Sequence, residues 1–328
     1  MIPDPRLLGG LLALTLSSGL QADTGDRLLR KAQRYFSPLP EAMPGAEQDT
    51  PKRIELGKKL YFDPRLSSND RQSCAICHPV GGGQAGMDNL ATSPGAEGQQ
   101  GRRNSPTVLN AGWQKAQFWD GRAKDLADQA GQPILNPIEM GMPSEQSVVD
   151  KLSATPDYPG AFEAAFPGYA QPLSYPNLRD AIAAFERTLR SESRFDDYLR
   201  GDKQALNESE KRGLDTFIKV NCVRCHDGPL VGGGMLEKLG LYGDFPSQDQ
   251  GRFEVTGEEK DRKVFKVPQL RNIALTGPWY HNGSVDNLEE AVRVMARLQL
   301  EREMSDSEVK DITAFLQTLN GKEFGHPE

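Results

Sequence analysis

The chain has 328 residues, a length that suits two domains of ordinary size better than one large one. Hydrophobic residues make up 37% of the chain, an ordinary share that excludes disordered and collagen-like proteins. Glycine (33) and proline (23) together exceed their usual share of roughly 12%, which predicts many turns and ordered loops. The net charge is -7 and no run of Lys and Arg is long enough to follow a phosphate backbone, so we expect no nucleic-acid partner.

The N-terminal region carries the one long apolar stretch of the sequence, residues 7–20. Arg6 precedes it and small residues follow it, which is the pattern of a secretory signal. We therefore predict a cleaved signal peptide over residues 1–22 and export to the periplasm. A membrane anchor is the alternative, because Asp4 cancels the charge of Arg6. Every later apolar stretch is broken by charges before the roughly 18 residues that a bilayer span needs.

Helices are the regular elements that the sequence predicts. Helix-start signals occur at Thr50 with Pro51, at Asn207 with Glu210 and at Ser305 with Glu308. Helical spacing of apolar residues covers residues 144–154, 177–190 and 288–300. No stretch alternates apolar and polar residues long enough to demand a sheet. The expected fold class is mainly α and rich in loops.

A proline-rich segment at residues 167–176 separates the predicted elements. We place the domain boundary there. The expected domains are an N-terminal domain over residues 23–172 and a C-terminal domain over residues 173–328.

All four cysteines fall in two copies of the pattern Cys-x-x-Cys-His. The motif residues are Cys74, Cys77 and His78, and Cys222, Cys225 and His226. This is the pattern for covalent attachment of c-type haem, in which two thiols meet the two vinyl groups and the imidazole lies beneath the iron. Two disulfides, a redox-active thiol pair or a zinc site built from both pairs are the alternatives. Redox pairs do not need the histidine, and zinc ribbons keep their cysteine pairs closer in sequence.

The surroundings of the two motifs are alike, which indicates an internal duplication. Gly57 precedes Tyr61 by four residues ahead of the first motif, and Gly213 precedes Phe217 in the same way ahead of the second. Three glycines follow each motif, at residues 81–83 and 232–234, where the backbone could approach a haem closely. We expect two cytochrome c-like haem domains.

The sixth position on each iron decides whether a haem carries electrons or binds peroxide. The histidines outside the motifs are His281 and His326, and methionines are the other candidate ligands. Met295 follows Leu288 and Val292 at the spacing i, i+4, i+7, which by itself is also the spacing of an ordinary helix core stripe.

Several further segments resemble the bacterial dihaem cytochrome c peroxidases, a family that includes the enzyme of methylamine dehydrogenase maturation. The resemblance covers nearly all of residues 50–320. Besides the two haem motifs, the matching segments are residues 103–107 (RNSPT), 118–122 (FWDGR), 129–130 (QA), 139–140 (EM), 270–272 (LRN), 280–283 (YHNG) and 288–292 (LEEAV).

The resemblance implies that His226 and Met295 ligate the C-terminal haem iron, and that His78 ligates the N-terminal one. The maturation enzymes have tyrosine where this chain has Met295. A thioether ligand raises the reduction potential, which suits a haem that receives and stores an electron. The resemblance implies that His281 supports the haem without binding its iron.

In many members of the family a histidine closes the N-terminal haem until the other haem is reduced. This chain has residues 93–98 (SPGAEG) at that place, and no histidine lies between His78 and His226. We therefore expect an iron that is open to peroxide without reductive activation, although Met87 or Glu97 could still approach it.

The resemblance assigns further roles to residues of the N-terminal half. Glu139 moves the proton that peroxide cleavage requires, Gln129 orients the peroxide, and Trp119 carries electrons between the haems. A calcium ion between the domains would be bound by Asn104 and by the backbone carbonyls of Thr276 and Pro278, a mixture of oxygen ligands that suits Ca²⁺.

The expected function is reduction of hydrogen peroxide to water by a periplasmic enzyme with two covalent haem c groups and one Ca²⁺. The electron donor would be a small periplasmic cytochrome c or copper protein, and the chain would form a homodimer. The alternatives are a dihaem electron-transfer cytochrome without peroxidase activity, and a dihaem enzyme that oxidises a tryptophan on a partner protein. The missing histidine argues against the former and Met295 against the latter.

Overall fold

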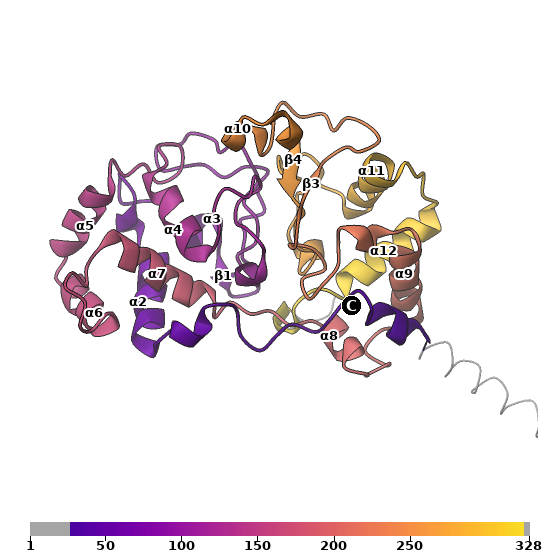
Figure 1. Cartoon of the computed structure of the whole chain (residues 1–328), viewed down its shortest axis with the longest axis horizontal. Coiled ribbons are helices and arrows are strands. Elements are labelled where there is room, and N and C mark those ends of the chain that lie inside the picture. The colour runs from indigo at the N-terminus through magenta and orange to yellow at the C-terminus, as the bar shows by residue number, and fades with distance from the viewer. Residues whose placement is uncertain (1–26, 325–328) are drawn as a thin grey trace, which may run out of the picture.

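Two hydrophobic cores organise residues 27–324, the part of the chain that the computed structural model describes (Figure 1). The signal peptide predicted at residues 1–22 and the candidate ligand His326 lie outside the described residues. The helices are α2 (Pro51–Tyr61), α3 (Cys74–Cys77), α4 (Leu126–Leu135), α5 (Glu145–Ser153), α6 (Asp157–Ala165), α7 (Tyr175–Glu186), α8 (Arg194–Leu199), α9 (Glu208–Lys219), α10 (Phe253–Thr256), α11 (Leu288–Leu300) and α12 (Asp306–Gln317). Within residues 27–324 no helix has the length and apolar character that a bilayer crossing requires.

The strands are short and form two separate antiparallel pairs. The first pairs β1 (Val80–Gly81) with β2 (Gln84–Ala85), directly after the first cysteine motif. The second pairs β3 (Leu236–Lys238) with β4 (Val264–Lys266), after the second motif. The prediction of a mainly α, loop-rich fold is therefore confirmed.

Side-chain capping sets the predicted starts of three helices. Thr50 accepts a hydrogen bond from the backbone of Arg53 at the start of α2. Asn207 with Glu210, and Ser305 with Glu308, form the reciprocal bonds of a capping box ahead of α9 and α12. The helical spacings at residues 144–154, 177–190 and 288–300 correspond to α5, α7 and α11.

The N-terminal core is built by α2, α4, α5, α6 and α7, at the left of Figure 1. The C-terminal core is built by α8, α9, α11 and α12, and the early residues Leu29, Ala32 and Phe36 complete it. The first described residues thus lie in the C-terminal half, and the chain crosses to the N-terminal half before α2. Because α7 packs with the N-terminal core, we propose that the division between the domains follows α7, near residue 190, instead of residue 172.

A helix pair with one close backbone approach lies at the centre of each core. At Gly57 of α2, a Cβ atom would lie 1.8 Å from the carbonyl oxygen of Ala181 in α7. At Gly213 of α9, a Cβ atom would lie 1.8 Å from the carbonyl oxygen of Asp311 in α12. Only glycine allows either pair to approach this closely. The same contact in both halves is what the predicted duplication would produce.

Candidate functional site

The first cysteine motif forms α3, and its histidine ends that helix. Nδ1 of His78 lies 3.3 Å from the carbonyl oxygen of Gly86, in the turn that follows β2. Burial lowers the pKa of His78, so the imidazole is neutral at pH 7. A neutral imidazole whose Nδ1 donates to a carbonyl keeps Nε2 available as a metal ligand.

The thiols of both motifs are free and half-buried. Burial raises the pKa of Cys74 and of Cys222 to about 12, so both remain protonated. A redox-active pair needs a lowered pKa, which these thiols lack. The two motifs lie in different halves of the molecule, and residues 27–324 contain no group of three or more His, Cys, Asp or Glu side chains that could hold a metal ion. The structure therefore does not bring the two cysteine pairs together, as a shared zinc site would require.

The second motif opens onto a largely apolar cavity of about 220 Å³. Cys222, Cys225 and His226 line it on one side. Burial lowers the pKa of His226 to about 4, and the backbone of Val231 and of Pro268 acts more weakly in the opposite direction. The Nδ1 atom of this imidazole is buried. At Gly232 a Cβ atom would lie 3.1 Å from this Nδ1, so the backbone there presses against the imidazole. Protonated thiols, a neutral imidazole and apolar walls fit a covalently attached haem.

Met295 lies on α11 and lines the same cavity as His226. Leu288 and Val292 line it too, so the stripe of apolar residues on α11 faces the cavity. His281 also lines the cavity, but its Nε2 lies 2.9 Å from Oγ of Ser247. The structure therefore brings Met295 and His226 to one cavity and gives Nε2 of His281 another partner.

The two glycine triplets have different roles. Residues 81–83 make the turn between β1 and β2 with positive φ angles of 85°, 61° and 84°, and a Cβ atom there would meet nothing within 4 Å. The first triplet therefore serves the turn conformation. Close approach is the role of Gly232 in the second triplet.

Glu139 lies in the loop after α4, where hydrogen bonds hold both its side chain and its backbone. Its Oε1 accepts a hydrogen bond of 2.8 Å from Asn136, and its backbone carbonyl accepts one of 2.7 Å from Ala96. Burial raises the pKa of Glu139, and its charge in turn raises the pKa of Cys74 and Cys77. The carboxyl group is thus a partly desolvated acid close to the first cysteine motif.

Gln129 lies on α4, the helix that leads into the loop carrying Glu139. Its side chain is half-buried. The structure therefore places Gln129 and Glu139 on successive segments of the N-terminal half.

The segment at residues 93–98, where many members of the resembled family have a histidine, lies close to the first motif. Gln72 donates both to Sγ of Cys77 at 3.2 Å and to the carbonyl of Pro94 at 3.3 Å. The exposed Glu97 accepts a hydrogen bond of 3.1 Å from Ser68. Asn69 donates to the carbonyl of Ala96. Met87 is buried and lines the cavity of the second motif. The Glu97 side chain is thus paired with Ser68 at the surface, and Met87 belongs to the wall of the second cavity.

Trp119 lies where the two halves meet. Its Nε1 donates to the carbonyl of Asn104 at 2.8 Å, and its ring meets the edge of the His281 ring at 6.4 Å. Its own carbonyl accepts a hydrogen bond of 2.6 Å from the backbone of Lys266 in β4. Contacts from both halves therefore fix this indole beside the second cavity.

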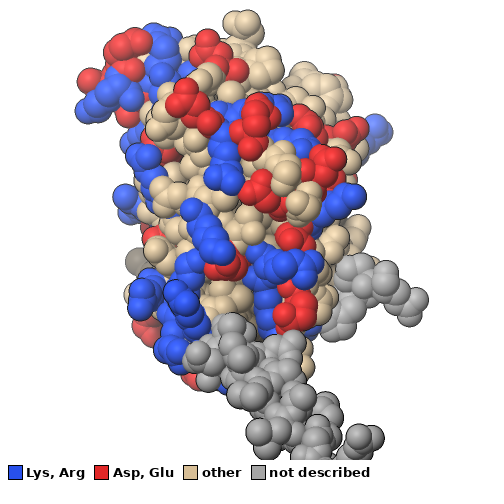
Figure 2. Space-filling model, turned by 90° about the vertical axis from the view of Figure 1, so that its right-hand side faces the viewer, with Lys and Arg blue, Asp and Glu red and all other residues tan. Residues whose placement is uncertain are grey.

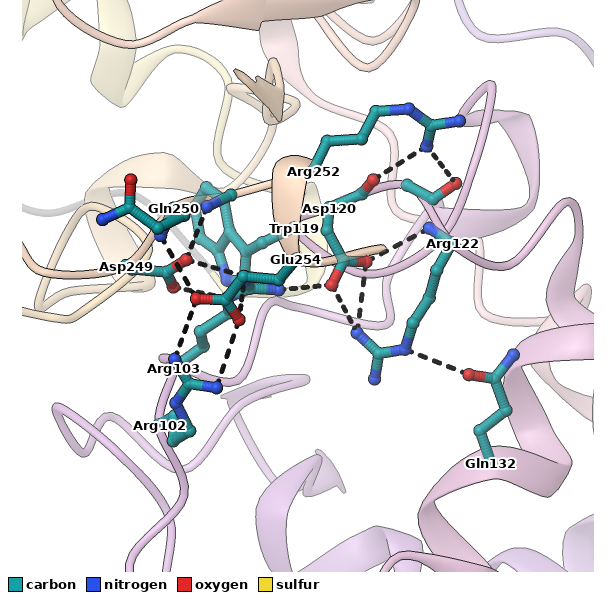
Figure 3. Close-up of polar contacts among 12 residues, drawn as sticks. Arg102, Arg103, Trp119, Asp120, Arg122, Gln132, Asp249, Gln250, Arg252 and Glu254 are labelled. Atoms are coloured by element: carbon teal, nitrogen blue, oxygen red, sulfur yellow. Dashed lines mark hydrogen bonds and ion pairs between the residues drawn. The ribbon is translucent and has the colours of Figure 1, made fainter. Parts of the chain in front are cut away.

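An ion-pair network, which we call the Arg103 network, surrounds Trp119 and joins the halves (Figure 3). It consists of Arg103, Asp120, Asp249 and Arg252. Arg103 donates to Asp249 through Nε (2.6 Å) and Nη2 (2.8 Å), and to Asp120 through Nη1 (2.5 Å). Arg252 donates to the carbonyl of Asp120 at 3.0 Å. Burial alone would raise the pKa of Asp249, but the hydrogen bonds from Arg103 outweigh it and lower the pKa.

The residues of the predicted calcium site line one cavity wall. Asn104, Thr276 and Pro278 all contribute to it. The amide nitrogen of Asn104 donates to the carbonyl of Leu90 at 2.8 Å, which leaves its side-chain oxygen as the potential ligand. Asn89 donates to the carbonyls of two residues adjoining Thr276 and Pro278, at 2.9 and 2.8 Å.

Several buried ionisable residues were not singled out by the sequence reasoning, and two of them lie close to the cysteine motifs or the cavity. Lys266 is 4% exposed and lines the second cavity, and Glu186 is 5% exposed, with its charge acting on Cys74. Burial lowers the pKa of Lys266 to about 7 and raises that of Glu186 to about 8. The sequence pattern that could have identified them is a charged residue directly after a run of apolar residues, as in residues 183–186 (AAFE) and 264–266 (VFK).

Comparison with known proteins gives consistent matches. The sequence model of a family described as "Di-haem cytochrome c peroxidase" matches residues 51–204. The cytochrome c551 peroxidase of Pseudomonas aeruginosa is 44% identical over 96% of this chain and 92% of its own. That of Nitrosomonas europaea is 48% identical over 81% of this chain and 79% of its own. The crystal structure of a MauG-like protein associated with microbial copper homeostasis is 31% identical, with a TM-score of 0.76 over 88% of this chain and 97% of that one.

Proposed function

The chain belongs to the di-haem cytochrome c peroxidase family and is a cytochrome-c peroxidase, and we propose that its electrons enter at the C-terminal haem and pass to the N-terminal haem. The family implies two haem c groups, hydrogen peroxide as substrate and a redox protein as donor. The haems supply one-electron redox centres and the iron at which peroxide binds.

Cys74 and Cys77 would attach the N-terminal haem, with His78 as its axial ligand. The support is a protonated thiol pair beside an imidazole whose Nδ1 faces a carbonyl. Cys222 and Cys225 would attach the C-terminal haem, between the axial ligands His226 and Met295. The support is the cavity that these four residues share.

Glu139 would accept the proton of peroxide and return it to the leaving oxygen. A carboxyl group whose pKa is raised by desolvation suits both steps, because it holds a proton more readily than an ordinary carboxylate and can still release it. Gln129 would orient the peroxide through its amide. Trp119 would carry electrons across the boundary between the halves, since contacts from both sides hold its ring.

The observation that carries the proposal is the half-buried Glu139 close to the first cysteine motif, with a pKa that desolvation raises, while Glu97 is exposed and paired with Ser68. The fully oxidised protein should therefore carry two covalent haems, show a high-spin ferric signal and react with peroxide without prior reduction. Haem content, electron spin resonance and stopped-flow mixing with peroxide measure these three properties.

The outcomes of this experiment separate the alternatives. Entirely low-spin haems that become reactive after one-electron reduction would overturn the open N-terminal iron. Two haems with no reaction in either state would instead identify an electron-transfer cytochrome.

Changing Met295 to histidine should lower the reduction potential of the C-terminal haem while both haems stay attached. Imidazole favours ferric iron more than a thioether does. Redox titration followed by absorption measures the potential, and the N-terminal haem in the same protein is the internal control. An unchanged potential would show that Met295 is a wall residue of the cavity and not a ligand.

The donor would be a small periplasmic cytochrome c or copper protein, and the enzyme a periplasmic homodimer. Figure 2 shows basic and acidic side chains interspersed over the outer face of the C-terminal half. A donor that docks on this face would meet charges of both signs. We also propose Ca²⁺ at Asn104, Thr276 and Pro278, on the support of their common position on the cavity wall.

A further inference from the structure

Lys266, the last residue of β4, is a buried basic side chain on the wall of the C-terminal cavity. It is 4% exposed, and lysine is almost never this buried without a paired charge. The other lining residue with a permanent cation is Arg224, which is exposed to solvent. Lys266 is therefore the buried basic group among the lysines and arginines that line this cavity, and a bound anion would favour its protonated form.

The ammonium group has unused hydrogen-bonding capacity. Its three N–H groups have one partner among residues 27–324, the side-chain oxygen of Gln114. No carboxylate of the described residues forms an ion pair with it. The carboxylate of Asp120 favours the protonated form of Lys266, but this carboxylate is already bound by Arg103 and Arg122. A buried ammonium with open donors is costly, so the site suits an incoming anion.

The haem that this cavity would hold supplies such an anion. Haem c carries two propionate carboxylates on an otherwise apolar ring, and its thioether and axial bonds leave those carboxylates free. We propose that Lys266, positioned by Gln114, binds a propionate of the C-terminal haem. The inference rests on the proposed haem at Cys222, Cys225 and His226.

The position of Lys266 gives the contact two consequences. A cation close to the ring disfavours the more positive ferric state, so Lys266 raises the potential of this haem. In addition, the backbone of Lys266 donates to the carbonyl of Trp119 at 2.6 Å. One residue thus anchors the haem edge and the tryptophan at the boundary between the halves.

The test compares haem-loaded variants at two lysines of the same strand pair. Lys266→Met removes the buried ammonium, and Lys238→Met removes an exposed one from the facing strand β3. Lys266→Met should shift the ferric/ferrous equilibrium of the C-terminal haem at least tenfold toward ferric, which is 59 mV for a one-electron couple. It should also shift the propionate bending band in the resonance Raman spectrum. Lys238→Met should change neither, and Lys266→Arg should retain most of the wild-type potential.

An unchanged potential and propionate band in Lys266→Met would overturn the inference, as would equal shifts in Lys238→Met. If Lys266→Met does not accumulate with haem, Gln114→Leu replaces it, because this change keeps the charge but frees the ammonium. The propionate band should then shift, and an unshifted band would overturn the inference. Wild-type protein that holds two haems and reduces peroxide would leave the proposed function intact in either case.

Discussion

Changing Glu139 to glutamine should slow peroxide turnover by on the order of 10²-fold or more, the usual scale for a general acid–base group. Glutamine preserves the size of the side chain and its contact with Asn136, but it cannot accept and return a proton. Both haems should stay attached and the high-spin ferric signal should persist. The loss would therefore lie in proton transfer and not in access to the iron.

The pH profile gives a second readout of the same residue. The carboxyl group must be ionised to accept the first proton, so activity should fall as the pH drops through the pKa of Glu139. Because burial raises this pKa, the acidic limb should lie above 4.5, the ordinary value for glutamate. The variant should lack this limb.

Steady-state and single-turnover rates with peroxide measure both effects. Glu163→Gln is the matched control, because Glu163 is an exposed acid on α6, away from either motif. Equal rates for Glu139→Gln and the wild type would remove Glu139 from the mechanism. A loss of the high-spin signal in the variant would instead assign it a structural role.

Changing Arg271 to methionine should lower the free energy of unfolding by about 3–5 kcal/mol, the cost of leaving one partner of a buried ion pair uncompensated. Arg271 and Asp196 both have fully buried side chains, joined by hydrogen bonds of 2.6 and 2.8 Å. The backbone of Leu39 also donates to Asp196 at 2.8 Å. The pair therefore ties the N-terminal segment to α8 and to the loop at residue 271.

The loss of unfolding free energy in Arg271→Met should depend on pH. Burial alone would raise the pKa of Asp196, but Arg271 outweighs it and the pKa lies below the ordinary value. In the wild type this contribution is complete above about pH 4 and is lost as the pH falls through the lower folded-state pKa. Without Arg271, burial raises the pKa of Asp196. The deficit should therefore be largest at neutral pH and shrink as the pH is lowered.

Urea unfolding of the haem-loaded enzyme, followed by circular dichroism, measures the effect. Arg212→Met is the control, because Arg212 pairs with Asp311 on the surface between α9 and α12, where solvent screens an ion pair and its loss changes stability little. Equal losses in the two variants would show that the burial of the Arg271 pair adds nothing to stability.

The cysteine motifs and the helix caps could be predicted from the sequence, because the residues that form each of them lie within a few positions of one another. The Cys-x-x-Cys-His motifs need only five consecutive residues. The capping boxes at Asn207 and Ser305 need only four, and the structure contains both. The spacing of Met295 likewise predicted the helix α11.

The tertiary structure alone decided what each of these elements faces. Helical spacing makes one side of α11 apolar, but it is the same whether that side meets a solid core or a haem cavity. Helical spacing likewise could not assign α7 to the N-terminal core, because this assignment depends on the contact of α7 with Gly57 in α2.

Residues far apart in sequence set the charges around the candidate site. Arg103 meets Asp249 across 146 residues, and Lys266 meets Gln114 across 152. The energy of a buried charge depends on the partners that folding brings to it, which sequence spacing does not encode. For this reason the sequence by itself determined the two Cys-x-x-Cys-His motifs proposed to attach haem, whereas the tertiary structure decided which charged groups surround the second cavity and Trp119.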